Sequence, residues 1–219
     1  MSINIAIDGP AGAGKSTIAK MVAKKLGYIY VDTGAMYRAM ALYIMRQGID
    51  PKDSARISCE CKNADISIKY EDGNQVVVLN GENVNGFIRA EEVGNMASST
   101  SVNPDVREKL VDLQRVLAAK ENVVMDGRDI GTVVLPNANV KIYLTASSRV
   151  RAQRRFLELQ EKGVQADLDV IEKEIIERDH RDMTRDISPL KQADDAVLID
   201  SSDMTIDEVV EKMISLAKC

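Results

Sequence analysis

Short runs of apolar, mostly β-branched residues recur along the chain, and most are followed by a segment whose apolar positions repeat every three or four residues. The first such segment is typical: Ile18, Met21, Val22 and Leu26 fall on one helical face, and Gly27 ends the segment. Strands separated by helices predict an α/β fold with a parallel five-stranded sheet flanked by helices. The five predicted strands cover residues 3–7, 28–31, 122–125, 140–144 and 196–199, and helices are predicted at 17–26, 35–46, 90–101, 148–162 and 169–185.

This alternation is interrupted between about residues 59 and 89. Ile66–Tyr70 alternates apolar and polar positions, residues 71–74 have the composition of a turn, and an apolar run at 76–79 leads into a second turn at Asn80-Gly81. The pattern predicts a small antiparallel β insert. We therefore expect one domain over residues 1–219, with a core of 1–58 and 90–219 and an insert of 59–89.

Two helix starts carry capping signals. Asn103 followed by Pro104 predicts an N-cap and a first helical residue, and Thr205 with Glu208 predicts a capping box before the last helix. The helix after Asn103 is predicted to bury one apolar stripe, made of Val106, Leu110, Leu113, Val116 and Leu117.

Composition narrows the class of protein. The chain has 219 residues, of which 45% are hydrophobic, so it is long enough for a full core. Its net charge of −5 does not favour nucleic acid or anionic membranes as partners. No apolar run is long enough to span a bilayer, and we expect neither a signal peptide nor a disulfide framework. The three cysteines (Cys59, Cys61 and Cys219) suit free thiols in a cytoplasmic protein, and the lone His180 suits a solvated surface position.

The segment between the first strand and the first helix reads G-x-x-x-x-G-K-S, the P-loop pattern. Its glycines let successive backbone N–H groups surround a phosphate, Lys15 reaches the β- and γ-phosphates, and Ser16 offers a hydroxyl to Mg²⁺. The alternative is an ordinary glycine-rich turn, which the strand before and the helix after disfavour. The predicted ATP-binding residues here are Gly9, Pro10, Ala11, Gly12, Ala13, Gly14, Lys15, Ser16 and Thr17.

Acidic residues follow three of the predicted strands, at Asp8, at Asp32 and at 126–129. In a parallel sheet such ends meet at one edge, so these side chains are expected to face one cleft. Asp126 is suited to orient Mg²⁺ or its water shell, as a Walker-B-like carboxylate. The alternative is an aspartate that caps a turn.

Arginines gather in the two helices predicted at 148–162 and 169–185. Arg151, Arg154 and Arg155 share one helical face by their spacing, and Arg178, Asp182 and Arg185 share another. Phosphoryl transfer needs positive charge around the moving group, which favours an Arg-rich helical lid over about residues 150–185, with Arg151 and Arg155 on ATP. The alternative is a pair of solvated helices joined by salt bridges, for example between Arg178 and Asp182.

Several longer runs resemble the bacterial cytidylate kinases, a family of P-loop nucleoside monophosphate kinases. They are I-D-G-P-A-G-A-G-K-S at 7–16, D-T-G-A-M-Y-R at 32–38, D-G-R-D-I-G-T at 126–132, E-R-D-H-R-D at 177–182, and the predicted insert. The resemblance covers essentially the whole chain. It implies an enzyme that transfers the γ-phosphoryl group of ATP, with Mg²⁺, to CMP or dCMP, and it favours a monomer.

The resemblance also implies roles for single residues. Arg38, Arg128 and Arg185 would hold the acceptor's phosphate, and Arg178 with Asp182 would hold its sugar hydroxyls. The cytosine edge would be read by Ser98, Arg107 and Asp129, with the adjacent Ser99 as the alternative to Ser98. In the lid, Met183 departs from the family's pattern, because related sequences often have a polar or basic residue there. We place Thr33 with the acceptor-binding residues, Ser16 on the metal, and the catalytic role on Lys15, Asp126, Arg128 and Arg185.

Two other functions remain open from the sequence. The first is a P-loop kinase for another acceptor, such as UMP, AMP or a small metabolite. The second is a nucleotide-dependent switch or binding module, which the absence of an Asn-Lys-x-Asp guanine-reading run disfavours.

Overall fold

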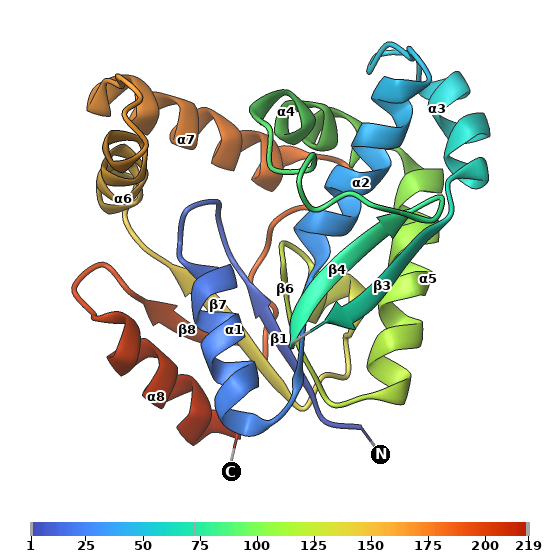
Figure 1. Ribbon diagram of the computed structural model, residues 1–219. Coiled ribbons are helices and arrows are strands. Elements are labelled where there is room, and N and C mark those ends of the chain that lie inside the picture. The colour runs from blue at the N-terminus through green and yellow to red at the C-terminus, as the bar shows by residue number, and fades with distance from the viewer. Residues whose placement is uncertain (1, 72, 218–219) are drawn as a thin grey trace. The chain divides into compact units, whose positions relative to one another are not determined.

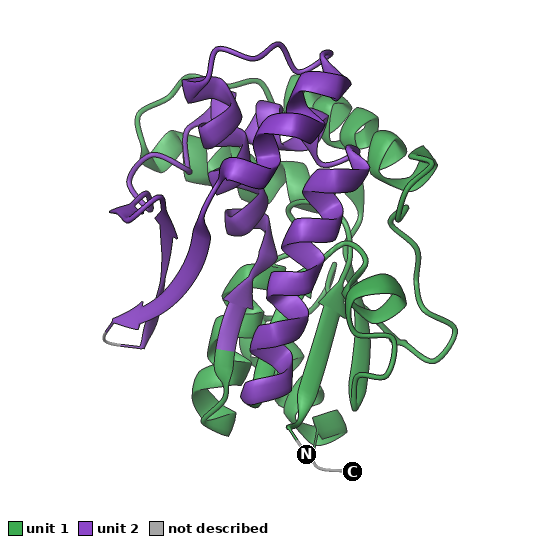
Figure 2. Cartoon of the chain, turned by 90° about the vertical axis from the view of Figure 1, so that its right-hand side faces the viewer, with its two compact units in different colours: residues 1–29, 122–219 green, residues 30–121 purple. Residues whose placement is uncertain are grey.

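The computed structural model describes residues 2–71 and 73–217, and it divides the chain into two compact units (Figure 2). The first unit contains residues 1–29 and 122–219, and the second contains residues 30–121. The predicted insert (59–89) therefore falls in the second unit and the predicted lid (150–185) in the first, while the predicted partition into core, insert and lid stays a prediction. Cys219 lies outside the described residues.

The larger sheet has five strands, as the sequence predicts, and their order is β2-β6-β1-β7-β8. Figure 1 labels β1, β6, β7 and β8 of this sheet. β1 pairs in parallel with β6 on one side and with β7 on the other, and β8 extends the sheet beyond β7. Strands β1, β6, β7 and β8 and helices α1, α6, α7 and α8 belong to the first unit, whereas residues 30–32 of β2 belong to the second. These elements span β1 Asn4–Asp8, α1 Lys15–Leu26, β2 Ile29–Asp32, β6 Val123–Gly127, β7 Val140–Thr145, α6 Ser148–Glu161, α7 Leu168–Thr184, β8 Val197–Asp200 and α8 Ile206–Ala217.

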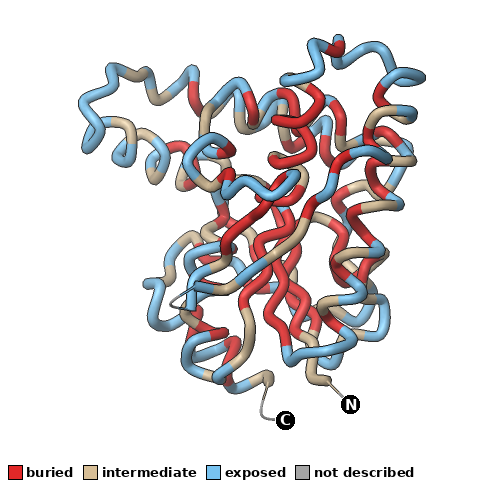
Figure 3. Tube along the Cα trace, turned by 45° about the vertical axis from the view of Figure 1, so that its right-hand side comes forward, coloured by how far each residue is buried: buried red, intermediate tan, exposed pale blue. Residues whose placement is uncertain are grey.

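The central strands are apolar because both faces of the sheet are covered. Ile5, Ala6 and Ile7 of β1 and Val123 and Val124 of β6 are fully buried (Figure 3). Their burial aligns the strand ends in register, so that Ile7 lies opposite Asp126. The polar ends of β1 and β6 are thereby brought to one edge of the sheet, as expected.

The second unit packs helices beside a small antiparallel sheet in the order β3-β4-β5. The hairpin of β3 and β4 confirms the predicted antiparallel insert, although the short β5 was not predicted. The elements are α2 Thr33–Arg46, α3 Ser54–Glu60, the 3₁₀ turn η1 Cys61–Asn63, β3 Ile66–Glu71, β4 Asn74–Leu79, β5 Glu82–Asn83, α4 Glu91–Thr100 and α5 Pro104–Lys120.

Several predictions at the level of single elements were wrong. α3 was not predicted, because it is short and buries only Ile57, so it has no apolar stripe. In α5, Val106 and Leu110 are buried as predicted, but Leu113 and Leu117 are only half-buried and Val116 is 49% exposed. The other buried residues of the helix are Arg107, Val111, Gln114 and Ala118. Two polar residues thus take places on a face that the hydrophobic pattern assigned to apolar side chains alone.

The capping predictions are confirmed. The Asn103 side chain accepts hydrogen bonds from the backbone N–H groups of Asp105 and Val106, and Pro104 is the first residue of α5. Thr205 and Glu208 bond reciprocally at the start of α8. None of the helices among the described residues is both long and apolar enough to cross a membrane.

Asn103 also joins two helices. Its Nδ2 donates to the carbonyl of Ser54 at 3.1 Å and to the hydroxyl of Ser58 at 3.0 Å, both in α3, while its Oδ1 caps α5. Because the residue is buried, its loss leaves backbone groups without a partner and away from water.

We expect Asn103→Ala to lower the free energy of unfolding by about 2 kcal/mol, since it removes a cap and a buried bridge together. Asp167→Ala is the matched control, because Asp167 caps α7 through the same two N–H positions but is exposed. Urea unfolding of both variants makes the comparison. An equal loss in the two would contradict the bridging role.

Candidate functional site

The loop between β1 and α1 has the geometry of a phosphate cradle. Gly9 has a φ of 147°, and a Cβ there would lie 1.9 Å from the carbonyl oxygen of Leu144 in β7, so only glycine fits. Gly12 and Gly14 also have positive φ, of 76° and 85°. Gly14 is the N-cap of α1 and has no side chain to occupy the first N–H groups of the helix. The loop therefore leaves the positive end of α1 available to an anion.

Lys15 is buried at the start of α1, and its Nζ donates a hydrogen bond to the carbonyl of Pro10 at 2.7 Å. Burial, and after it the neighbouring charge of Arg128, lower the pKa of Lys15 to about 7, against the opposite effect of Asp126, Asp8 and Asp182. The negative charges of a nucleotide's phosphates would favour the protonated amine. The ammonium group is therefore held where an anion would stabilise it.

Ser16 and Asp126 meet across the sheet edge. The Ser16 hydroxyl donates to Oδ2 of Asp126 at 2.9 Å, and Asp126 is buried at the end of β6. A hydroxyl and a carboxylate at this place are oxygen ligands of the kind Mg²⁺ takes in P-loop proteins, where phosphates and water complete its shell. Among the described residues no group of three or more His, Cys, Asp or Glu could hold a metal ion by itself. The donor set fits a magnesium ion that arrives with a nucleotide.

Asp8 fixes the segment that follows β6. Its two carboxylate oxygens accept hydrogen bonds from the backbone N–H groups of Ile130 and Gly131, both at 2.7 Å. These residues begin a π-helical turn, η2 (Ile130–Val134). Burial raises the pKa of Asp8 to about 6, although the two backbone hydrogen bonds favour the ionised form. Asp8 therefore sets the position of Arg128 and Asp129, a role that the sequence did not reveal.

Two ion pairs connect the segment after β6 with α7 and the chain just beyond it. Arg128 Nε donates to Oδ2 of Asp182 at 2.9 Å, and Arg185 Nη2 lies 3.9 Å from Oδ1 of Asp129. All four side chains are at least three-quarters buried. Asp182 therefore pairs with Arg128, whereas the salt-bridge alternative in the sequence analysis paired it with Arg178. Arg178 lies half-buried on α7, one turn before Asp182.

The arginines of α6 have different partners from one another. The buried guanidinium of Arg151 donates to the carbonyls of Ala146 at 2.8 Å and Ala11 at 3.0 Å, and it pairs with Asp179 of α7 at 2.7 Å. Arg154 donates to the carbonyl of Ser201, whereas Arg155 is exposed and pairs with Glu158. Arg151 thus holds the P-loop backbone through Ala11. The assignment of Arg151 and Arg155 to ATP stays a prediction.

Arg149 links α6 to α7 at their near ends. Its Nη1 lies 2.6 Å from Asp169 and 2.9 Å from Glu172, and the Ser148 hydroxyl also donates to Glu172. These contacts agree with the alternative of salt-bridged helices for this residue. His180 is exposed, as predicted.

In the second unit, Thr33 and Arg38 lie on α2. Thr33 is buried at the first position of α2, directly after Asp32, which caps the helix by accepting from the N–H of Ala35. Arg38 Nη1 donates to the carbonyl of Ile88 at 3.2 Å, and its guanidinium lies against Gly94 of α4, where a Cβ would come within 2.8 Å. Gly94 therefore makes room for this arginine.

Ser98 and Arg107 lie on neighbouring helices of the same unit. Arg107 is buried on α5, its Nη1 donates to the carbonyl of Ser101 at 3.4 Å, and its guanidinium lies over the ring of Tyr37 at 5.7 Å. Ser98 is half-buried on α4, and its carbonyl accepts from the Ser101 hydroxyl. The structure thus connects Arg107 to Ser98 through Ser101, which bonds to both of them.

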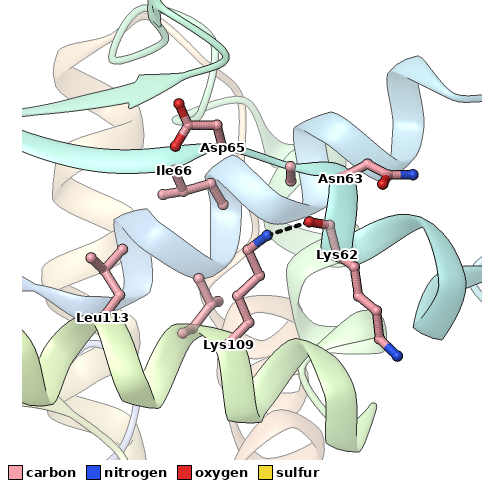
Figure 4. Close-up of a pocket in the computed structure, with 8 residues that line it drawn as sticks. Lys62, Asn63, Asp65, Ile66, Lys109 and Leu113 are labelled. Carbon is pink, nitrogen blue, oxygen red and sulfur yellow. Dashed lines mark hydrogen bonds between the residues drawn. The ribbon is translucent and has the colours of Figure 1, made fainter.

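A separate hollow of about 390 Å³ opens beside η1 and α5 (Figure 4). Lys109 reaches across it and donates to the carbonyl of Lys62 at 2.8 Å. Its lining includes none of the residues predicted to bind nucleotide. The lining residues are Lys62, Asn63, Ala64, Asp65, Ile66, Lys109, Leu110 and Leu113.

The sequence of this chain is similar to those of known proteins over nearly its full length. The family model described as "Cytidylate kinase" matches residues 5–219. A cytidylate kinase of Caldicellulosiruptor bescii is 53% identical over 214 residues, which cover 98% of this chain and 95% of that protein. A cytidylate kinase of Lactobacillus johnsonii is 51% identical, with 98% of this chain and 93% of that protein covered. Among solved structures, a shikimate kinase of Bacteroides thetaiotaomicron has the same fold, with a TM-score of 0.51, 15% identity and 99% of each chain covered.

We expect the contribution of Asp8 to stability to depend on pH. Because its pKa is higher in the folded protein than the ordinary value near 4, the folded state holds the proton more tightly, so stability falls as the pH rises from about 4 to about 6 and then levels off. In Asp8→Asn this titration is absent. The free energy of unfolding of the wild type minus that of the variant should therefore fall by roughly 2 kcal/mol between pH 4 and pH 6.

Urea unfolding between pH 4 and pH 8 measures this difference. Asp203→Asn, an exposed change in the same unit, is the control and should follow the wild type throughout. A difference between wild type and Asp8→Asn that stays constant over the whole range would contradict the raised pKa.

Proposed function

Because the chain belongs to the cytidylate kinase family, we propose that it transfers the γ-phosphoryl group of ATP to CMP or dCMP, giving ADP and CDP or dCDP. The observation that carries this proposal is the P-loop with its buried Lys15 next to the Ser16–Asp126 hydrogen bond. Phosphoryl transfer needs positioning and positive charge more than covalent chemistry, and this loop offers both.

On the donor side, backbone N–H groups of residues 9–17 and the first turn of α1 bind the phosphates of ATP, and Lys15 adds a point charge. Ser16 and Asp126 are the residues that would hold Mg²⁺ or its water shell. When bound, the ion neutralises phosphate charge as it builds up during transfer. When phosphates bind, their negative charge raises the pKa of the buried Lys15 amine, which keeps it in the charged form that the transfer requires.

On the acceptor side, the attacking oxygen belongs to a phosphate that is already anionic, so the reaction needs no strong general base. We assign Arg128 and Arg185 of the first unit, together with Arg38 of the second, to the acceptor's phosphate. Their guanidinium groups match phosphate oxygens in pairs of hydrogen bonds. Thr33, Arg178 and Asp182 complete this side, the last two on the sugar hydroxyls.

We assign the choice of base to Ser98, Arg107 and Asp129. Cytosine presents an amino donor and ring acceptors, which suit a carboxylate and a guanidinium respectively. Uracil reverses two of these groups and would leave buried polar atoms unpaired, which costs more than a missing methyl group. The same residues therefore accept CMP and reject UMP.

The test of the function is ADP formation from ATP and Mg²⁺ with CMP, dCMP, UMP, AMP or no acceptor, measured side by side. Turnover confined to CMP and dCMP is the expected result. Turnover with another acceptor would agree with the proposed ATP-binding residues but contradict the assignment of Ser98, Arg107 and Asp129 to cytosine. Tight nucleotide binding without turnover would favour a binding module. The cytoplasmic location and the monomeric state stay predictions.

Arg107→Ala and Asp129→Ala should each lower kcat/KM for CMP about 100-fold or more, because a base-reading hydrogen bond is lost, while ATP affinity stays within about twofold. Arg56→Ala, an exposed change on α3, is the control. Unchanged CMP kinetics in both variants would remove the base assignment.

We also propose that α6 and α7 form a lid that closes over bound nucleotides. Arg149 and Ser148 join the two helices at one end, and a loop with Gly163 at a φ of 70° joins them at the other. Closure would exclude water from the transferred group.

Protease cleavage near Gly163 should therefore slow several-fold when ATP and CMP are both present, because closure protects the loop. Limited proteolysis with mass-spectrometric assignment of the cut sites measures this. Cleavage at an exposed site outside the lid, such as Lys52, is the internal control. Equal cleavage near Gly163 with and without ligands would contradict lid closure.

A further inference from the structure

The β3–β4 hairpin is fixed to the turn between β2 and α2 by side chains rather than by strand pairing. α2 contacts both strands of the hairpin (Figure 1). The hairpin and the turn lie in the same compact unit (Figure 2). The turn matters because Asp32 ends β2 and Thr33 begins α2. Whatever holds Asp32 also holds the first turn of the helix that carries Thr33 and Arg38.

Gln75 of β4 makes the central contact. Its Oε1 accepts from the backbone N–H of Asp32 at 2.7 Å, and its Nε2 donates to the backbone carbonyl of Asp32 at 3.2 Å. An amide side chain satisfies both groups of one residue at once, as a neighbouring strand would. Neither a carboxylate nor an apolar side chain of the same length can do this. The residue type at position 75 is therefore matched to the task.

Two further contacts hold the same segment. The Tyr70 hydroxyl of β3 donates to the carbonyl of Tyr30 at 3.0 Å, and Arg89 pairs with Oδ2 of Asp32 at 2.9 Å. Asn85 steadies β4 itself, because it accepts from the N–H of Val77 and donates to the carbonyl of Gln75. The hairpin thus meets the β2–α2 turn at two successive points, and its own backbone is fixed where Gln75 projects.

The segment that follows the hairpin contacts Arg38, which lies further along α2. The carbonyls of Ile88 and Ala90 lie 3.2 and 3.5 Å from Nη1 of Arg38. The hairpin and the chain that leaves it therefore constrain both Thr33, through Asp32, and Arg38. Lys69 of β3, by contrast, is exposed on the hairpin.

From these contacts we propose that Gln75 is a positioning residue for the acceptor nucleotide, acting through the backbone of Asp32 on Thr33 and the first turn of α2. The β3–β4 hairpin is accordingly a positioning element for Thr33 and Arg38, two of the acceptor-binding side chains of its unit. This inference rests on the proposed function, in which Thr33 and Arg38 belong to the acceptor site.

The test compares Gln75→Met, which keeps length and shape but loses both hydrogen bonds, with the wild-type chain. We expect the KM for CMP to rise about tenfold, with the KM for ATP within about twofold, because only the acceptor side depends on the turn. Gln75→Glu is the second variant, since it keeps an acceptor for the Asp32 N–H but turns an oxygen toward the Asp32 carbonyl. It should also raise the KM for CMP. Lys69→Ala, on the same hairpin, is the matched control and should leave both constants unchanged.

Hydrogen–deuterium exchange without nucleotides gives a readout that does not depend on activity. Peptides covering residues 30–37 should exchange faster in Gln75→Met than in the wild type and in Lys69→Ala. Unchanged exchange there, or an equal rise in the KM for CMP and for ATP, would overturn the proposal, since a general loss of stability affects both substrates. If the acceptor panel identifies another acceptor, the proposed function fails, and the Gln75 comparison is decided with that acceptor.

Discussion

The buried carboxylate of Asp8 is the contact on which the arrangement of the nucleotide site depends. Asp8 ends the central strand β1 and accepts hydrogen bonds from the backbone N–H groups of Ile130 and Gly131. This one carboxylate therefore connects two segments that are more than 100 residues apart in the sequence. Two backbone donors would otherwise be buried without partners, at a cost of about 1–3 kcal/mol each. Because Arg128 and Asp129 directly precede these donors, their placement follows from a buried carboxylate at the end of β1.

Arg151 does for the P-loop what Asp8 does for the segment after β6. Its guanidinium is shared between the Ala11 carbonyl, the Ala146 carbonyl and the Asp179 carboxylate, and it is almost fully buried. A buried charge is tolerated only when its hydrogen bonds are satisfied, and this one is satisfied by three different elements. The P-loop, α6 and α7 therefore share a single ionic contact, which ties the shape of the phosphate loop to the helices proposed as a lid.

The sequence predicted those features that leave a local signal. The P-loop, the caps at Asn103 and Thr205, and the five strands follow from residue types at fixed spacings, and the structure has them. The exposure of Val116, the helix α3 and the third strand β5 were missed because tertiary packing, and not local periodicity, decides them. The roles of Asp8, Arg151 and Gln75 could not be read either, since each depends on a partner far away in sequence. A family resemblance supplies positions for substrate contacts, but it does not reveal which side chains hold those positions in place.

The chain leaves the first unit after Ile29 and returns to it at Asn122, and the backbone N–H of Ile29 donates to the carbonyl of Asn122 at 2.9 Å. The two ends of the 92-residue excursion are therefore joined by a single hydrogen bond of the first unit. The entropic cost of closing such a loop rises only slowly with its length, by about 0.6 kcal/mol for each doubling. A change of length within the excursion beyond β2 is therefore tolerated at little cost and leaves the register of β1 and β6 unchanged. Because the acceptor contacts proposed above come from both stretches of sequence, a change of acceptor would require substitutions in both of them.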